Sequence, residues 1–352
     1  MTFAESREGG RLFDIAARRE YLWGPMTNPM PGRRDFGAEI LAARARIESG
    51  IAHTPAEFSA PLSEMTGARV FIKWECEQFA GSFKLRGALN KLRSITPAER
   101  AAGVVSASTG NHGLAISHAS KLEKVALKLF LPATASEVKR RKIEELGVAV
   151  ESFGTDCGKT EVHAREEASR TGRVFVSPYN DWDIVFGAGT AGLEIAGDVP
   201  DVDDVIVPVG GGGLISGIAA ALRAFRPAAR TVGVEPEASA FMAASVAAGR
   251  LVEIAERETI ADAVAGGIEP GSITFPLYRE LVDRTLIVGE AAIASAMSLV
   301  FRTHGKMIEG AGALPLAGLL SFPTAFRGRR VVLVVSGKNI SPDRFREVAG
   351  LG

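Results

Sequence analysis

The chain has 352 residues, of which 46% are hydrophobic and 23% are charged, which is enough for two packed domains and excludes a disordered or low-complexity protein. Lysine plus arginine and aspartate plus glutamate each number 41, so no net field attracts nucleic acid or an anionic membrane surface. We therefore expect a small-molecule partner, no nucleic acid and no membrane.

The sequence also lacks signals for secretion, disulfide bonding and transition metals. The longest uncharged apolar stretch, Gly310 to Phe322, is too short to span a bilayer and predicts a buried helix. The N-terminus has no apolar core with a cleavage site, and two cysteines, Cys76 and Cys157, are too few for a disulfide framework. The histidines and cysteines show no metal-ligand spacing. These features favour a cytoplasmic protein without a transition-metal site.

Residues 1–36 mix arginine, glutamate, proline and methionine without a sustained period and predict a flexible N-terminal tail. Further along, short apolar runs alternate with amphipathic stretches. This alternation predicts strands at 103–108, 125–132, 148–154 and 173–178, with helices at 113–122, 136–146 and 159–171 between them. Such a β-α order is typical of an open parallel sheet with right-handed crossovers.

A second α/β series follows. It predicts strands at 205–209, 231–236, 285–289 and 331–335, with helices after the first glycine-rich turn and at 291–303 and 312–320. The two series together predict two α/β domains with a cleft between them. Ligands of open parallel sheets bind beyond the carboxyl ends of the strands, so the loops there are the first candidates for a site.

One such loop consists of four glycines, Gly210 to Gly213, between an apolar strand and a helix. Without side chains, their N–H groups can converge on an anion beside the positive end of the helix dipole, as in a phosphate site. A flexible turn and a dinucleotide-binding turn are the alternatives. The dinucleotide pattern would need glycine at Ile215, although Glu235 lies about where a ribose-binding acid would. The glycine loop alone does not distinguish a phosphate site from a flexible turn or a dinucleotide-binding turn.

A second loop combines hydroxyl, amide and imidazole side chains after the strand at 103–108. At the start of a helix, such donors suit a carboxylate, although an ordinary N-cap is the simpler interpretation. Its pairing with the glycine loop favours the carboxylate. The residues concerned are Ser106, Ser108, Thr109, Gly110, Asn111 and His112.

Lys84 lies beside Phe83 at the foot of an amphipathic helix. A lysine in such a place is usually a solvated surface residue, but a desolvated amine with a lowered pKa is also what Schiff-base chemistry requires. The residues alone do not decide between these two interpretations.

The order of several motifs resembles that of the fold-type II pyridoxal-phosphate enzymes, most closely the threonine/serine dehydratase branch that includes serine racemases. The resemblance runs from Glu39 to Asn339. The motifs are HTPAEFSAPLSEMTGARVFIKWE (53–75), GSFKLRGA (81–88), STGNHG (108–113), GGGGL (210–214), IEPGSITF (268–275), EGAGALPLAG (309–318) and SGKN (336–339). The resemblance implies the tryptophan synthase beta-like fold, with the active site between two open, mostly parallel twisted sheets.

The resemblance also implies roles for individual residues. Lys84 would hold pyridoxal 5′-phosphate as a Schiff base and remove the α-proton, and Asn111 would bond the phenolic oxygen. Ser336 would face the pyridine nitrogen. The implied cofactor-binding residues are Phe83, Lys84, Asn111, Gly210, Gly211, Gly212, Gly213, Leu214, Glu309 and Ser336. Those implied to receive the substrate carboxylate are Ser108, Thr109, Gly110 and His112.

The implied reaction is the dehydration and deamination of a β-hydroxy amino acid, with L-threonine and L-serine as default substrates, to a 2-oxo acid and ammonia. A serine hydroxyl does not force the pyridine nitrogen to stay protonated, so the ring is a weaker electron sink and elimination is favoured over transamination. Racemisation is an alternative, with the Thr109 hydroxyl as the second catalytic group. A second alternative is the dehydration of a 3-hydroxyaspartate, which needs a cation for the distal carboxylate. A third is a non-catalytic ligand-binding protein, and the intact Lys84 argues against this third alternative.

Some positions depart from the family pattern. Where many relatives have a divalent-cation site, Glu235 matches one acid, but Phe241 stands in place of the second, so a divalent cation is doubtful and no metal ligand is assigned. Gly187 to Thr190 and Lys338 also depart from the usual motifs. We also expect a homodimer, and no appended regulatory domain, because the sequence continues for only about a dozen residues after the SGKN motif. Its expected organisation is a large cofactor-binding domain (37–102 with 180–352) and a small mobile domain (103–179).

Overall fold

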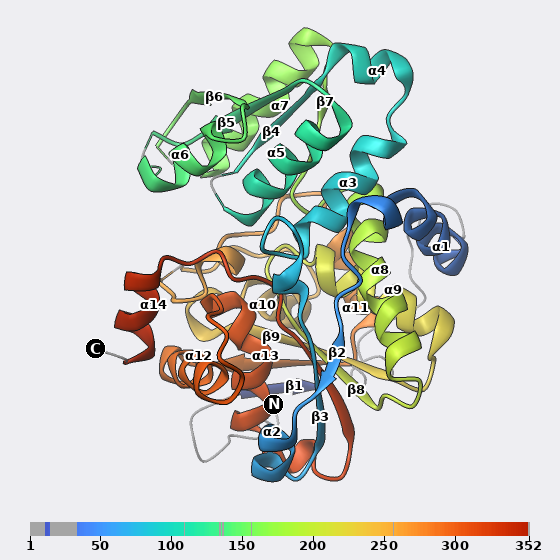
Figure 1. Ribbon diagram of the computed structural model, residues 1–352, viewed down its shortest axis with the longest axis vertical. Helices are drawn as coiled ribbons and strands as arrows, with labels where there is room; N and C mark the ends of the chain where they lie inside the picture. Colours follow the sequence, from blue (N-terminus) through green and yellow to red (C-terminus); the bar gives the residue numbers. More distant parts are fainter. Residues whose placement is uncertain are drawn as a thin grey trace.

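The computed structural model describes residues 11–14, 34–108, 110–133, 135, 137–155, 157–255 and 257–350, and it arranges them in two α/β units, one above the other in Figure 1. Within these ranges, seven strands form the larger sheet and four form the smaller one. No helix in the described parts of the chain is long and apolar enough to cross a membrane.

The larger sheet is parallel in its interior and has an antiparallel strand at each edge. Its strands are β1 (Arg11–Asp14), β2 (Ala56–Phe58), β3 (Arg69–Lys73), β8 (Asp204–Pro208), β9 (Arg230–Pro236), β10 (Arg284–Val288) and β11 (Arg330–Val334). They follow the order β1-β10-β9-β8-β11-β3-β2, in which β1 and β2 run antiparallel to their neighbours. The inner strands are covered on both faces, which is why they read as continuous apolar runs.

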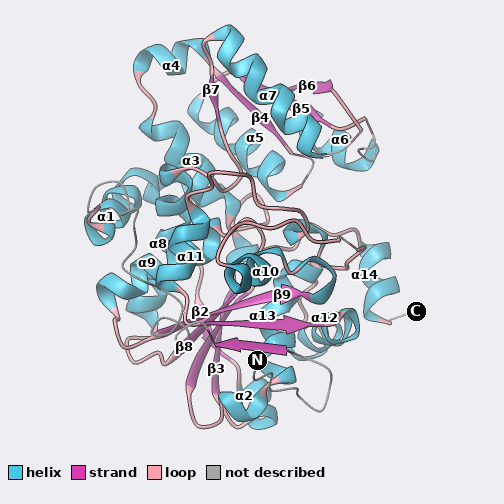
Figure 2. Ribbon diagram, turned by 180° about the vertical axis from the view of Figure 1, so that it is seen from behind, coloured by secondary structure: helices cyan, strands magenta, loops and turns pink. Residues whose placement is uncertain are grey.

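Helices cover both faces of this sheet (Figure 2). They are α1 (Phe36–Ile47), α2 (Ala60–Thr66), α8 (Trp182–Asp198), α9 (Gly213–Phe225), α10 (Phe241–Ala248), α11 (Thr274–Leu281), α12 (Glu290–His304), α13 (Gly310–Ser321) and α14 (Pro342–Ala349). Because neighbouring strand residues point to opposite faces, Val205 packs with α1, α8, α9 and α11, whereas Ile206 packs with α2, α12, α13 and α14. Each face therefore has its own apolar core.

The smaller sheet is parallel throughout, in the order β6-β5-β4-β7. Its strands are β4 (Val104–Ala107), β5 (Leu127–Leu131), β6 (Ala149–Ser152) and β7 (Val174–Phe175), and its helices are α3 (Lys84–Ser94), α4 (Pro97–Ala102), α5 (Asn111–Glu123), α6 (Glu137–Glu144) and α7 (Cys157–Thr171). Helices α3 and α5 share a core on one face, and α7 packs on the other. Helix α3 also contacts α8, so it joins the two units.

The predicted fold class, two mostly parallel sheets of an α/β protein, is confirmed. The strand expected at 173–178 is shorter than predicted: its ladder with β4 consists of Val174 and Phe175, followed by one bond from Val176 N to the carbonyl of Val105. The segment predicted to be a tail contributes a strand: Arg11–Asp14 pairs antiparallel with β10, and four residues are too few to show a period in the sequence. The domain boundaries at 103 and 179 stay a prediction.

Candidate active site

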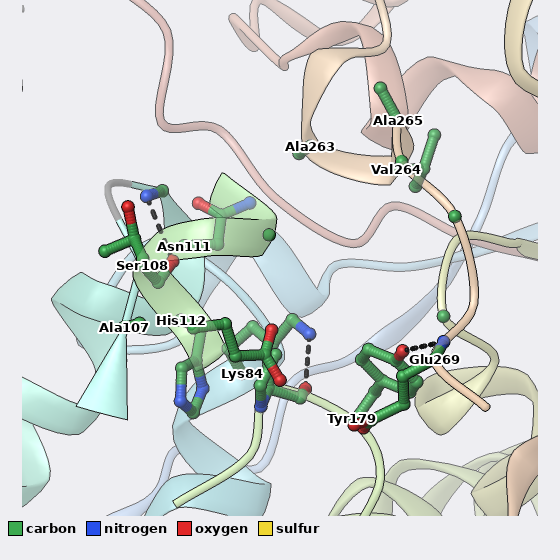
Figure 3. A pocket seen from close by; sticks show the side chains of 18 of the residues that line it. Lys84, Ala107, Ser108, Asn111, His112, Tyr179, Ala263, Val264, Ala265 and Glu269 are labelled. Atoms are coloured by element: carbon green, nitrogen blue, oxygen red, sulfur yellow. Dashed lines mark hydrogen bonds between the residues drawn. The ribbon is translucent and has the colours of Figure 1, made fainter. Parts of the chain in front are cut away.

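A cavity of about 680 Å³ lies between the two units, beside the loops that follow strands β4 and β8 (Figure 3). The predicted site residues that line it are Lys84, Ser108, Gly110, Asn111, His112, Gly211 and Glu309. Thr109 lies outside the described residues. The structure therefore brings the lysine motif, the loop after β4 and the glycine loop together around one space.

Lys84 is the first residue of α3 and points into this cavity (Figure 3). Its Nζ donates to the carbonyl oxygen of Pro178 at 2.7 Å. Burial lowers the pKa of the Lys84 amine to about 8, although the negative charge of Glu161 partly opposes this shift. A larger fraction of the amine is thus unprotonated near neutral pH than for an ordinary lysine, which suits a nucleophile for an aldehyde.

A buried ion network fixes the helix that begins at Lys84. Arg86 is completely buried, and its Nε and Nη2 donate to Glu75 at 2.7 and 2.8 Å. Its Nη1 and Nη2 also donate to Glu194 at 2.8 and 2.7 Å, and Lys73 pairs with Glu194 at 2.6 Å. Burial alone would raise the pKa of Glu194, but Arg86 and Lys73 lower it to about 2. These contacts tie α3 to α8 and to the end of β3.

The glycine loop packs closely against its surroundings. Gly212 has a φ of +84°, which favours glycine, and Gly213 begins α9. A Cβ on Gly211 would lie 2.5 Å from Cγ of Tyr179, and the hydroxyl of Thr274 donates to the Gly211 carbonyl at 2.6 Å. The loop thus has no room for a side chain on Gly211, which lines the cavity near the N-terminus of α9, where backbone N–H groups and the helix dipole favour an anion such as phosphate.

Three polar side chains link the start of α5 to the loops before α13 and after β11. Asn111 donates through Nδ2 to Glu309 Oε1 at 2.6 Å, and it accepts at Oδ1 from Asn339 Nδ2 at 2.6 Å. All three line the cavity. The backbone fits around them closely, since a Cβ on Gly337 would lie 2.2 Å from Glu309 Oε1. Asn111 is therefore held in one orientation by partners on the larger unit.

His112 is buried and neutral. The Ser106 hydroxyl donates to the Val176 carbonyl at 2.7 Å, so its oxygen accepts from His112 Nε2, which lies 3.0 Å away. Burial and the charge of Lys84 lower the pKa of His112 to about 3. At neutral pH this imidazole thus brings no positive charge to a substrate carboxylate. In the same loop, Gly110 N donates to Ser108 Oγ at 3.2 Å.

The other predicted cofactor residues lie beside the cavity rather than in its wall. The ring of Phe83 lies with its centroid 5.1 Å from Lys84 Nζ, and Phe83 N donates to the carbonyl of Ser336 at 3.0 Å. Ser336 is buried, so β11 ends directly behind the lysine motif. The remaining residues of this group, which adjoin Gly211, are Gly210, Gly212, Gly213 and Leu214.

Several cavity residues were not predicted. Tyr179 follows the end of β7, so the rule that sites lie beyond strand ends could have found it. Glu269 lies in the IEPGSITF motif (268–275), which could have found it. Glu161 and Arg165 gave no signal, because charged residues on a helix are usually solvated. The ion network around Arg86 was missed for a similar reason: nothing in the sequence marks a charged residue as buried.

Glu235 is the position at which a cation was doubtful. It is buried, and its two carboxylate oxygens accept from the backbone N–H groups of Met242 and Ala243, each at 2.8 Å. Burial raises its pKa to about 8, against the effect of these two bonds. In the described residues no group of three or more histidine, cysteine, aspartate or glutamate side chains is placed to hold a metal ion. The carboxylate of Glu235 caps α10 in this arrangement.

Comparisons with known proteins agree with this geometry. The chain is 37% identical over 314 residues to the catabolic L-threonine dehydratase of Escherichia coli K12, covering 89% of this chain and 95% of that protein. The structure of the present chain is similar to that of threonine deaminase isoform 2 from Solanum lycopersicum, with a TM-score of 0.86 and 30% identity. The match covers 92% of this chain and 96% of that one. The structure is also similar to that of maize serine racemase (TM-score 0.84, 32% identity, 88% and 95%). The model of the pyridoxal-phosphate dependent enzyme family matches residues 47–337, and the chain therefore belongs to this family, as its motifs predicted.

Proposed function

We propose that this protein dehydrates and deaminates a β-hydroxy amino acid, with L-threonine and L-serine as default substrates, to a 2-oxo acid and ammonia. The observation that carries the proposal is Lys84, an amine with a lowered pKa, in a cavity shared by the glycine loop and the start of α5. The names of the relatives support this reaction, since one is an L-threonine dehydratase and another a threonine deaminase.

The cavity residues suit pyridoxal 5′-phosphate. When bound, this cofactor supplies the electron sink for the electron pair left on Cα. The N–H groups of Gly210 to Gly213 and the N-terminus of α9 would hold its phosphate, and Asn111, oriented by Glu309, would bond its phenolic oxygen. The hydroxyl of Ser336 would face its pyridine nitrogen.

Lys84 has two tasks in this proposal. Its amine would hold the cofactor, and as a free base it would take the proton from Cα of the bound substrate. Ser108 and Gly110 lie at the start of α5, where backbone N–H groups and the helix dipole favour a substrate carboxylate. These contacts would hold the carboxylate so that the Cα–H bond faces Lys84. The β-hydroxyl would then leave as water, with the proton that Lys84 took from Cα, as the electron pair from Cα forms a double bond to Cβ. Hydrolysis of the resulting enamine would give the 2-oxo acid and ammonia.

Racemisation is the second candidate, because the chain is similar to maize serine racemase over most of its length. It requires a proton donor on the face of Cα opposite Lys84, and the sequence offers the hydroxyl of Thr109 for this role. The two reactions differ in product: elimination gives a 2-oxo acid, whereas racemisation gives the amino acid with the opposite configuration at Cα.

The test is a product screen with the purified holoenzyme on both enantiomers of serine, threonine, 3-hydroxyaspartate and phenylserine. We expect 2-oxo acid from L-threonine and L-serine to form faster than the amino acid inverted at Cα appears by chiral chromatography. Lys84→Ala should lose this activity, whereas the exposed control Lys121→Ala should keep it. Inversion at Cα faster than 2-oxo acid release would favour the racemase, and turnover of neither kind would contradict both. We also expect a homodimer, which light scattering after size-exclusion chromatography would test.

A further inference from the structure

A second group of charged side chains lies in the wall of the cavity and takes no part in the roles proposed above. It consists of Glu161 and Arg165, four residues apart on α7, and Glu269, on the loop before α11. We call it the charged triad. Arg165 Nη2 lies 2.7 Å from Glu161 Oε1 and 2.7 Å from Glu269 Oε2. The arginine thus has a carboxylate on each side and links the smaller unit to the larger one.

Other contacts hold the triad in place. The guanidinium of Arg165 lies over the Phe175 ring, 4.2 Å from its centre, and this cation–π contact restrains it. The backbone N–H of Glu269 donates to the hydroxyl of Tyr179 at 2.9 Å, and the ring of Tyr179 packs on Gly211. Figure 3 shows Tyr179 and Glu269 across the cavity from Ser108 and Asn111. Glu269 therefore lies away from the loop proposed to receive the substrate carboxylate.

The charges that line the cavity are mostly negative. Its described cationic side chains are Lys84 and Arg165, and its carboxylates are Glu161, Asp262, Glu269 and Glu309. His112 is neutral at physiological pH, because its pKa is lowered to about 3. The triad itself carries two negative charges and one positive charge. A substrate side chain that reaches it meets a net negative field.

We propose that the charged triad selects substrates by charge, accepting β-hydroxy amino acids with an uncharged side chain and rejecting those with a second carboxylate. This inference rests on the proposed function and narrows its substrate class. Glu161 and Glu269 already share Nη2 of Arg165, so a distal carboxylate that reaches this guanidinium lies beside two like charges. At the effective dielectric of a partly buried site, a like charge about 6 Å away weakens binding by about tenfold or more. On this ground 3-hydroxyaspartate is a poor substrate.

The test compares two ligands of nearly equal size that differ in side-chain charge, L-asparagine and L-aspartate. Each is titrated into the holoenzyme at pH 8, and binding is followed by the visible absorbance of the bound cofactor, which needs no turnover. The variants are Glu161→Gln, Glu269→Gln and the two combined. Glu166→Gln is the matched control, because Glu166 is an exposed residue of the same helix that does not line the cavity.

In the parent we expect asparagine to bind at least about tenfold more tightly than aspartate. Each triad variant should reduce this preference, and the double variant should abolish or reverse it because Arg165 becomes free to pair with the ligand. Glu166→Gln should leave the preference unchanged. The proposal is overturned if the parent binds aspartate as tightly as asparagine, if the triad variants keep the parent preference, or if neither ligand binds, since size would then set the limit. Lack of 2-oxo acid formation with a retained asparagine preference would instead contradict the proposed reaction alone.

Discussion

Replacing Arg86 with leucine should destabilise the protein by about 3 to 5 kcal/mol, the usual cost of removing one partner from a buried ion pair. The partners of Arg86 explain why this loss in the free energy of unfolding is larger than for most single substitutions. Glu194 would keep Lys73 and Arg44 as partners. Glu75 is completely buried and would keep the hydroxyl of Thr54 at 2.5 Å, but its charge would lose the guanidinium that neutralises it.

The assay is urea unfolding, with the cofactor content of the folded protein as a second readout, because Lys84 lies two residues before Arg86. We expect both stability and cofactor content to fall. The control Arg170→Leu should change stability much less, because Arg170 also pairs with a glutamate but its side chain is 72% exposed. Adding Glu75→Gln to Arg86→Leu should restore about 1 kcal/mol or more, because it removes the unpaired charge. A loss below about 1 kcal/mol in Arg86→Leu would refute this account of how α3 is held.

Three further predictions concern the cofactor and the metal. Gly211→Ala should lower cofactor affinity while the fold persists, because the added Cβ would lie 2.5 Å from the Tyr179 ring. Cofactor affinity is measured by equilibrium dialysis, and an unchanged value would contradict the proposed phosphate site. Ser336→Asp should favour protonation of the pyridine nitrogen and lower 2-oxo acid formation with the cofactor still bound, and a variant equal to the parent in rate and spectrum would show that Ser336 is not the partner of that nitrogen. Exhaustive EDTA treatment should leave most activity intact, and Phe241→Asp should create or strengthen a response to Mg²⁺; a parent that loses activity on chelation and regains it with Mg²⁺ would contradict this expectation.

The sequence predicted most strands because buried parallel strands are continuous apolar runs bounded by turn residues. The strands β8, β9, β10 and β11 each lie within one residue of the predicted bounds at both ends. The same signal could not reveal β1, which consists of Arg11–Asp14 and is held by pairing with β10 rather than by its own pattern. Edge strands of this kind depend on tertiary contacts, which local propensity does not encode.

For the site, motif order predicted that Lys84, Asn111 and the glycine loop meet at one cavity. The pKa shifts of the site residues could not be predicted from the sequence. The pKa values of Lys84 and His112 are lowered chiefly by burial, and burial is known only once the chain is folded. Arg165 is a further example, since a glutamate and an arginine four residues apart on a helix usually form a solvated pair, and its contact with Glu269 depends on how the two units pack.

The most direct test of the central claim identifies the lysine that carries the cofactor and measures the enzyme's loss of activity in the same preparation. The purified enzyme, active in releasing 2-oxo acid from L-threonine, is reduced with borohydride, digested and analysed by peptide mass spectrometry. We expect the reduced cofactor on Lys84 in nearly every chain, with activity lost in proportion to the modification. Cofactor attached to another lysine, or 2-oxo acid release that survives complete modification of Lys84, would contradict the claim.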